Sequence, residues 1–140
     1  MPRPGLRNSR LAALLIVLAV YPAGLLGYVW YHCWSTSLEG GKNGPLDAYR
    51  HTLSSAMLAY TTTPSAVGFV SRVMEFQNRP TDLMDRHNNA IGAEIGKHAH
   101  SLDEIEPLVR ARIEAGAIDA RTGTQATWLP PQQWRTSFFW

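Results

Sequence analysis

The chain opens with a long apolar segment that carries no charged side chain. Residues 11–31 read LAALLIVLAVYPAGLLGYVWY, which is 21 residues without Asp, Glu, Lys or Arg. A helix of about 20 such residues is long enough to cross the roughly 30 Å hydrocarbon core of a bilayer. Pro22 and Gly24 lie inside it, and membrane-spanning helices tolerate both residues. The pattern therefore predicts a transmembrane anchor over 11–31 that contacts the lipid bilayer.

The charges that flank this segment predict its orientation. Three arginines precede it, and the first acidic residue of the chain is Glu39. Because positively charged flanks stay in the cytoplasm, we expect residues 1–10 there, a single pass through a bacterial inner membrane, and the rest of the chain in the periplasm. The alternative is a cleaved signal peptide. Its apolar core would be shorter, at about 7–15 residues, and would end in a small-residue cleavage site, so an uncleaved anchor is favoured.

After the anchor, residues 32–44 are polar and rich in glycine, which is typical of a short tether. Apolar positions then recur at spacings of three and four residues, as they do in amphipathic helices. They predict helices over about 45–60, 65–78 and 82–98, and a fourth that begins near 104–107 and ends near Gly116. Thr81 is the expected N-cap of the third of these helices. The expected fold is all-α: an N-terminal transmembrane helix and a bundle of about four helices within residues 45–140.

The end of the chain lacks this periodicity. Residues after Gly116 contain a turn sequence and a set of large aromatic side chains, namely Trp128, Trp134, Phe138, Phe139 and Trp140. Aromatic residues of this kind pack onto apolar surfaces or lie at membrane interfaces. We therefore expect an irregular tail that packs against the bundle or the bilayer surface.

Composition and charge limit the kinds of molecule that the domain is expected to bind. Of 13 Lys and Arg residues, three precede the anchor, which leaves 10 against 11 Asp and Glu in the remainder. A nearly neutral domain without a basic stripe is not expected to bind nucleic acid, and the sequence indicates no particular protein partner. The lone cysteine, Cys33, excludes an intramolecular disulfide. It is expected to lie at the membrane exit as an inert thiol, with intermolecular pairing as the alternative.

Two pairs of polar residues on the predicted helices indicate a site. Asp47 and His51 are four residues apart on the first, and Asp85 and Asn89 are four residues apart on the third. Residues at this spacing share one helix face. Gly92 follows on the same face of the third helix and would let another helix approach closely. We expect the two polar faces to meet.

A site built from these four side chains would offer mostly oxygen ligands and one imidazole. Helical bundles build metal sites in this way, from residues on facing helices. The expected cofactor is one divalent metal ion held by Asp47, His51, Asp85 and Asn89, and this ligand set suits zinc, manganese or calcium equally well. Glu75, on the second predicted helix, is a candidate general base, so the candidate catalytic residues are His51, Asp85 and Glu75.

The same residues also allow a purely structural explanation. Asp47 could accept hydrogen bonds from His51 and Asn89, while Arg50 pairs with Asp85. Such a satisfied polar layer would fix the register of the helices and perform no chemistry. His87 lies about 200° around the helix from Asp85 and is therefore expected at the surface or behind the site. His98 and His100, at a helix end, are expected in solvent.

The motifs also resemble an uncharacterised bacterial domain family found in secreted proteins and toxin-like C-terminal modules. Its pattern is DA-x-RH, a later HE, and MD-x-HNN-x-x-G, and the match covers about residues 44–98. Met74 stands where the family usually has the histidine of HE. The resemblance implies a helical domain in which the motif residues cluster in space: Asp47, Arg50, His51, Glu75, Asp85, His87, Asn88 and Asn89. Arg50, His87, Asn88 and Gly92 are the expected supporting residues.

Three functions are consistent with these features. The first is an anchored periplasmic hydrolase that uses a metal ion, or the pair of His51 and Asp85, to activate water against an ester or phosphodiester. The second is a non-catalytic envelope module that binds a partner or the bilayer surface through its aromatic tail. The third is a toxin-like or lysis-related module tethered at the inner membrane.

Overall fold

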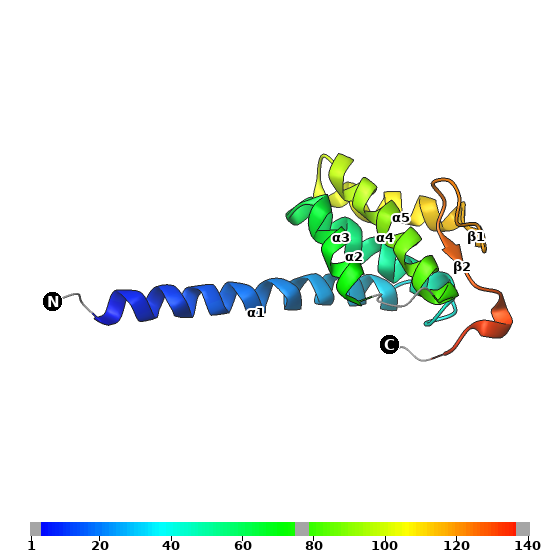
Figure 1. Ribbon diagram of the computed structural model, residues 1–140. Helices are drawn as coiled ribbons and strands as arrows, with labels where there is room; N and C mark the ends of the chain where they lie inside the picture. Colours follow the sequence, from blue (N-terminus) through cyan, green and yellow to red (C-terminus); the bar gives the residue numbers. More distant parts are fainter. Residues whose placement is uncertain (1–3, 75–78, 137–140) are drawn as a thin grey trace.

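The computed structural model describes residues 4–74 and 79–136, and this part of the chain is mostly helical (Figure 1). The helices are α1 (Pro4–Trp34), α2 (Pro45–Thr61), α3 (Pro64–Met74), α4 (Pro80–His98) and α5 (Ile105–Glu114). Two short 3-10 turns are η1 (Leu102–Glu104) and η2 (Pro131–Gln133), and two short strands are β1 (Ala117–Ile118) and β2 (Thr127–Trp128). The predicted all-α character is confirmed.

Proline is the first residue of three consecutive helices of the bundle. Pro45, Pro64 and Pro80 are the first residues of α2, α3 and α4. Proline suits this position because its missing N–H would have no helical partner and its φ angle is already helical. The prediction that Thr81 caps α4 is wrong, because the helix begins one residue earlier. The carboxylate of Asp82 instead accepts a hydrogen bond from the backbone N–H of Arg79, at 3.0 Å.

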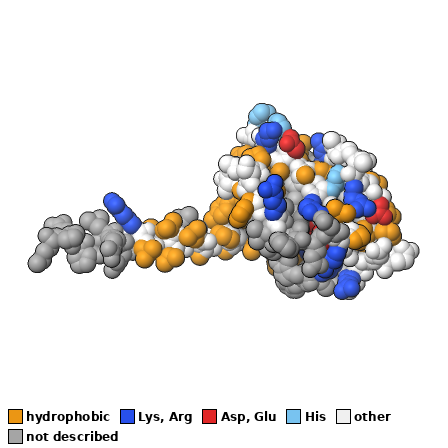
Figure 2. Space-filling view, viewed as in Figure 1, with side chains coloured by type: hydrophobic (Ala, Val, Ile, Leu, Met, Phe, Trp, Pro, Cys, Tyr) orange, Lys and Arg blue, Asp and Glu red, His pale blue; other side chains and the backbone are white. Residues whose placement is uncertain are grey.

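Helix α1 belongs partly to the bundle. Figure 1 shows its N-terminal half projecting away from the other helices, while its C-terminal half lies against them. The stretch from Ser9 to Trp34 is the one helix among the described residues that is long and apolar enough to cross a membrane. Hydrophobic side chains cover most of the described portion of this projecting part in Figure 2. Near its C-terminal end, however, Val29 is buried in the core of the bundle.

Two expectations about the region after the anchor are therefore corrected. Cys33 is buried in the same core as Val29, so it is neither an interfacial thiol nor accessible for intermolecular pairing. The segment 35–44 also does more than tether the domain. Its Asn43 accepts a backbone hydrogen bond from Leu129 at 2.9 Å, and Lys42 forms an isolated antiparallel bridge with Arg135. The segment is packed into the domain.

The core centres on the contact between α2 and α4. Tyr49 and Leu53 of α2 are fully buried, and Ile91 and Ile95 of α4 pack in the same cluster. Two glycines of α4 lie directly against α2. A Cβ atom on Gly92 would stand 2.2 Å from the carbonyl oxygen of Thr52, and one on Gly96 would stand 2.2 Å from that of Ala56. No side chain fits at either position, which confirms the expected close approach at Gly92.

The two strands were not predicted. They pair in parallel, with Ala117 opposite Thr127 and Ile118 opposite Trp128. Each strand has two residues, which is too short for an alternating pattern to be visible in the sequence. Trp128 packs against the core, as expected for the aromatic tail, while residues 137–140 lie outside the described part of the chain.

We expect Gly92→Ala to lower the free energy of unfolding by about 1–3 kcal/mol, because the added methyl group forces α2 and α4 apart. Gly68→Ala is the matched control: Gly68 also lies within a helix, but nothing lies within 4 Å of a Cβ atom placed there. Alanine should stabilise that position by about 0.5–1 kcal/mol. Thermal melting of the full chain in a nonionic detergent measures both. Equal effects of the two substitutions would contradict the close helix contact.

Candidate functional site

The two polar faces meet as expected. Helix α2 presents Asp47 and His51, and α4 presents Asp85 and Asn89. His51 Nε2 lies 3.6 Å from Asp47 Oδ1 and 3.5 Å from Asp85 Oδ1, and Nδ1 of the same ring lies 3.3 Å from Asn89 Oδ1. One ligand atom from each of Asp47, His51 and Asp85 lies within 4.8 Å of the other two. These three residues form the candidate metal centre.

Asp47 is held in place from several sides. Its Oδ2 accepts a hydrogen bond from the backbone N–H of Asn43 at 2.6 Å, and its Oδ1 is paired with the guanidinium of Arg50. Arg50 also donates to the carbonyl oxygen of Gly41 at 3.1 Å and lies over the ring of Trp30. The buried carboxylate is therefore oriented by α1, by the segment before α2 and by α2 itself.

The orientation of His51 leaves one ring nitrogen for the cluster. Asn89 Oδ1 accepts a hydrogen bond from Ser55 Oγ at 2.8 Å and faces His51 Nδ1. An amide oxygen can only accept, so this contact favours a proton on Nδ1 and a lone pair on Nε2. Nε2 is the atom that faces both carboxylates. A neutral imidazole in this tautomer, oriented by a hydrogen bond behind it, is the form that binds metal ions.

Asp85 is the least satisfied of the three. Its Oδ1 is buried and has no hydrogen-bond partner among the described residues. Burial, followed by the nearby charge of Asp47, raises the pKa of Asp85 to about 7, against the opposing effects of Arg50 and Lys42. A buried carboxylate without a donor destabilises a fold. A cation bound between Asp85 and Asp47 would remove that cost.

The spacings fit a small metal ion. In a tetrahedral zinc site with ligands about 2.1 Å from the ion, neighbouring ligand atoms lie about 3.4 Å apart. The two distances from His51 Nε2, 3.6 and 3.5 Å, are close to that value. Three protein ligands would leave a position open for water or substrate, as in catalytic zinc sites. Asn89 was predicted as a fourth ligand, but its oxygen is occupied by Ser55 and His51, so it is better described as orienting His51.

The structural alternative predicted different partners. It paired Arg50 with Asp85 and placed Asn89 on Asp47. Arg50 instead pairs with Asp47, and Asn89 contacts His51. The residue that faces Asp85 Oδ1 is therefore His51, at 3.5 Å.

Consecutive residues of α4 point to different sides of the helix and contact different parts of the domain. His87 was expected at the surface or behind the site, and its Nε2 lies 3.0 Å from the backbone oxygen of Gln125, away from the metal-centre residues. Asn88 is fully buried, donates to the carbonyl oxygen of Thr127 at 2.8 Å and accepts from its N–H at 2.9 Å. The family resemblance implied that His87 and Asn88 join the cluster, and in the structure their hydrogen bonds are with the C-terminal segment. They hold the C-terminal segment against α4.

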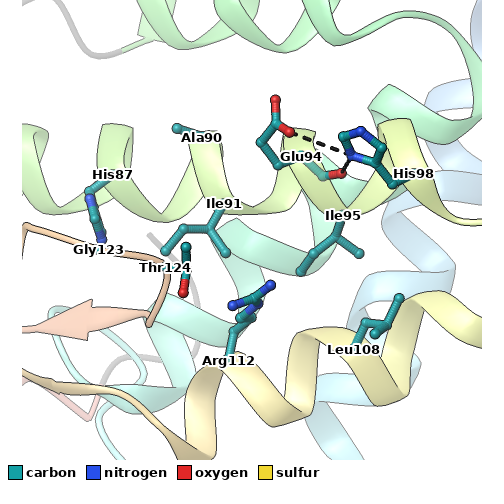
Figure 3. Close-up of a pocket in the computed structure, with 10 residues that line it drawn as sticks. All are labelled: His87, Ala90, Ile91, Glu94, Ile95, His98, Leu108, Arg112, Gly123 and Thr124. Atoms are coloured by element: carbon teal, nitrogen blue, oxygen red, sulfur yellow. Dashed lines mark hydrogen bonds and ion pairs between the residues drawn. The ribbon is translucent and has the colours of Figure 1, made fainter.

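Three positions singled out in the sequence remain. Glu75, the candidate general base, lies outside the described residues. His98 is exposed, and its Nδ1 lies 3.5 Å from a carboxylate oxygen of Glu94 (Figure 3). The backbone N–H of His100 donates to Glu104. His87 and His98 border a pocket of about 520 Å³ whose lining includes the apolar side chains of Ile91 and Ile95 (Figure 3).

A second pocket, of about 570 Å³, opens onto the metal-centre residues. Its walls come from the segment before α2, from α2, from the start of α4 and from the C-terminal tail. The lining side chains include four cations, Lys42, Arg50, Arg79 and Arg135, as well as Asp47, His51, Asp82 and Asp85. A substrate could therefore reach the cluster directly from solvent.

Two contributors to the site were missed in the sequence. Ser55 lies four residues after His51 and therefore on the same helix face, which is the signal that could have identified it. Asn43 has a φ angle of 65°, a left-handed conformation that asparagine tolerates better than most residues. This turn directs its N–H at Asp47. Asn43 precedes Gly44, and Asn-Gly is a common turn sequence, so the turn could have been identified, although its hydrogen bond to Asp47 could not.

Comparisons of this chain with protein-family models, with curated proteins and with solved structures gave no match. The resemblance noted from the motifs therefore stays a prediction, and the function has to be argued from the geometry of the site.

We expect Asn88→Ala to lower the free energy of unfolding by about 2–4 kcal/mol, because it leaves buried backbone groups of Thr127 unpaired. The substitution should not change metal affinity, since Asn88 faces away from the cluster. His87→Ala, which removes one contact from a half-buried side chain, should cost less than about 1 kcal/mol. Thermal melting measures the stability of the two variants, and metal titration measures their metal affinity. A loss of metal affinity in Asn88→Ala without a loss of stability would contradict the assignment.

Asp85→Asn should stabilise the metal-free protein at neutral pH. The raised pKa of Asp85 means that the folded state favours the protonated acid, so wild-type stability is lost as pH rises from about 4, the unfolded pKa, to about 7. Asparagine has no proton to lose. The variant should therefore have the same free energy of unfolding as the wild type near pH 4. At pH 8 its free energy of unfolding should be higher by a few kcal/mol. Unfolding in the presence of a chelator at several pH values measures this, and a pH-independent difference would refute it.

Proposed function

We propose that this chain is a membrane-anchored, metal-dependent hydrolase of an ester or phosphodiester. The observation that carries the proposal is the buried carboxylate oxygen of Asp85, which lacks a hydrogen-bond donor and faces His51 Nε2 at 3.5 Å beside an open pocket. A polar layer that only fixed helix register would be expected to satisfy this oxygen. Groups left unsatisfied at a cost in stability are typical of functional sites.

Each residue has a distinct role in this proposal. Asp47, His51 and Asp85 would hold the ion, Arg50 orients Asp47, and Asn89 orients His51. A divalent ion at this position would lower the pKa of a bound water molecule and polarise the bond to be hydrolysed. The residues themselves leave one side of the cluster open to the pocket, where that water and the substrate could lie. Zinc fits the spacing best, and manganese suits the same mixed ligands.

The same geometry supports a metal-free variant of the mechanism. With its pKa raised to about 7, Asp85 could accept a proton from water near neutral pH, and His51 could assist. Chelation separates the two versions, because only the metal-dependent reaction stops when the ion is removed.

The anchor is part of the proposal. The apolar surface of α1 between Ser9 and Val20 supports insertion into a bilayer, and the arginines before it favour a cytoplasmic N-terminus. The helical domain would then act in the periplasm, close to the outer surface of the inner membrane.

Metal titration of the purified full chain tests the proposal. With zinc or manganese as the probe, we expect one ion per wild-type chain and at least about 100-fold weaker binding in His51→Gln, because one of three protein ligands is lost. Hydrolysis of bis(p-nitrophenyl) phosphate or p-nitrophenyl acetate should fall in parallel and stop with a chelator.

His98→Gln is the matched control for the metal titration, since His98 is also an imidazole beside a carboxylate but is exposed. It should bind metal and turn over substrate like the wild type. If His51→Gln and wild type bind the ions equally, or if neither binds any and no ester is hydrolysed, the proposal fails. The chain would then be better explained as a non-catalytic envelope module.

A further inference from the structure

Two cations from distant parts of the chain are held opposite one another at the pocket. The backbone N–H of Lys42 donates to the carbonyl oxygen of Arg135, and the N–H of Arg135 donates to that of Lys42, both at 3.1 Å. This is an antiparallel bridge. Residues that exchange both hydrogen bonds are direct cross-strand neighbours, and like charges at such positions are destabilising. The fold therefore brings two positive charges together at a cost.

The other cations of the pocket have acidic partners. Arg50 pairs with Asp47, and Arg79 Nε lies 3.2 Å from Asp82 Oδ2. Neither Lys42 nor Arg135 forms an ion pair with an acidic residue in the part of the chain that the structure describes. Once these pairs are set aside, Asp85 remains as the third acidic residue of the pocket, and the proposed function assigns it to the metal ion. The pocket then retains the two positive charges of Lys42 and Arg135 beside the metal-centre residues. An anion would relieve their repulsion.

We propose that Lys42 and Arg135 bind the charged phosphate oxygens of a phosphate ester whose phosphorus lies at the cluster of Asp47, His51 and Asp85. This inference rests on the proposed function and selects one substrate class from it. Arginine can contact two phosphate oxygens at once through its planar guanidinium, and lysine supplies a point charge. A neutral carboxylic ester offers no negative charge to these side chains and should be a poorer substrate.

The reaction that follows is hydrolysis of a phosphodiester. The oxygen of a water molecule forms a bond to phosphorus, the ester P–O bond breaks, and the leaving oxygen takes up a proton. The products are a phosphate monoester and an alcohol, and no oxidant or other co-reactant is needed. The phosphodiester could belong to a phospholipid headgroup or to a soluble molecule, and the two share the chemistry that Lys42 and Arg135 recognise.

The test uses the full chain in nonionic detergent at fixed ionic strength. The double variant Lys42→Gln/Arg135→Gln is compared with Lys97→Gln/Arg121→Gln, which removes the same charge from exposed positions outside this pocket. Calorimetric titration with inorganic phosphate should show at least about tenfold weaker binding in the pocket variant, because two charge-assisted contacts are lost. The control should bind like the wild type. The control should keep wild-type zinc affinity and melting temperature. The pocket variant should still bind one zinc ion and should melt at or above the wild-type temperature, because it removes the repulsion between Lys42 and Arg135.

Turnover supplies a second readout. The pocket variant should raise the KM for bis(p-nitrophenyl) phosphate by at least about tenfold relative to its KM for the neutral ester p-nitrophenyl acetate. Phosphatidylglycerol in mixed micelles is compared with this soluble diester to test whether the substrate is a phospholipid headgroup. A lower KM for the lipid identifies headgroups, and a lower KM for the soluble diester identifies a soluble substrate. Either result supports the proposal if Lys42→Gln/Arg135→Gln raises the KM for the preferred substrate.

The outcomes separate the two proposals. If the wild type binds zinc and hydrolyses esters but phosphate binding is unaffected by Lys42→Gln/Arg135→Gln, the inference is overturned and the metal-dependent hydrolase stands. An equal loss of phosphate affinity in the charge-matched control would also overturn it. If no zinc binds but the pocket variant alone loses phosphate affinity, the anion site is supported and the metal centre fails.

Discussion

The close contact between α2 and α4 is the constraint on which the site depends. Gly92 and Gly96 place the backbone of α4 directly against carbonyl groups of α2, with no room for a Cβ atom. The polar side chains nearer the start of each helix are thereby brought within a few ångströms of each other. His51 can contact Asp85 only because the helix axes lie this close. The glycines therefore position the site even though they have no side chain to contribute.

Residues 87–89 of α4 contact two different parts of the domain. Successive helix residues point about 100° apart, so neighbours cannot all face one centre. His87 and Asn88 bind the backbone of the C-terminal segment, whereas Asn89 faces α2 and orients His51. The C-terminal segment in turn carries Arg135 to the pocket. Fold and site are therefore linked through the same helix, and a motif that reads as one cluster in the sequence has two separate roles.

Much of this arrangement followed from spacing in the sequence. The i, i+4 pairs and the glycine on the same face were enough to predict that Asp47, His51 and Asp85 meet, because helix geometry fixes which residues share a face. The partners of Arg50 and Asn89 could not be predicted, since each side chain reaches several acceptors and the choice depends on helix rotation by a few degrees. The bridge between Lys42 and Arg135 could not be predicted either. It joins segments with no periodic pattern.

The apolar helix shows a different limit of sequence reasoning. Lipid and protein core both favour the same side chains, so composition alone cannot divide α1 between them. The structure divides it: Leu14 and Leu18 are exposed, whereas Val29 and Cys33 are buried against α2. The end of α1 is therefore part of the domain. Trp30 near the end of α1 lies under the guanidinium of Arg50, which orients Asp47, so this helix supports the site from behind.

The central claim is that Asp47, His51 and Asp85 form one ligand set. X-ray absorption spectroscopy of the zinc-loaded full chain tests it most directly, because it reports which atoms surround the ion. The account predicts a shell of nitrogen and oxygen atoms at about 2.0–2.2 Å with the scattering of a single imidazole, which disappears in His51→Gln. A shell with two or more imidazoles, a sulfur ligand, or a spectrum unchanged by that substitution would contradict it.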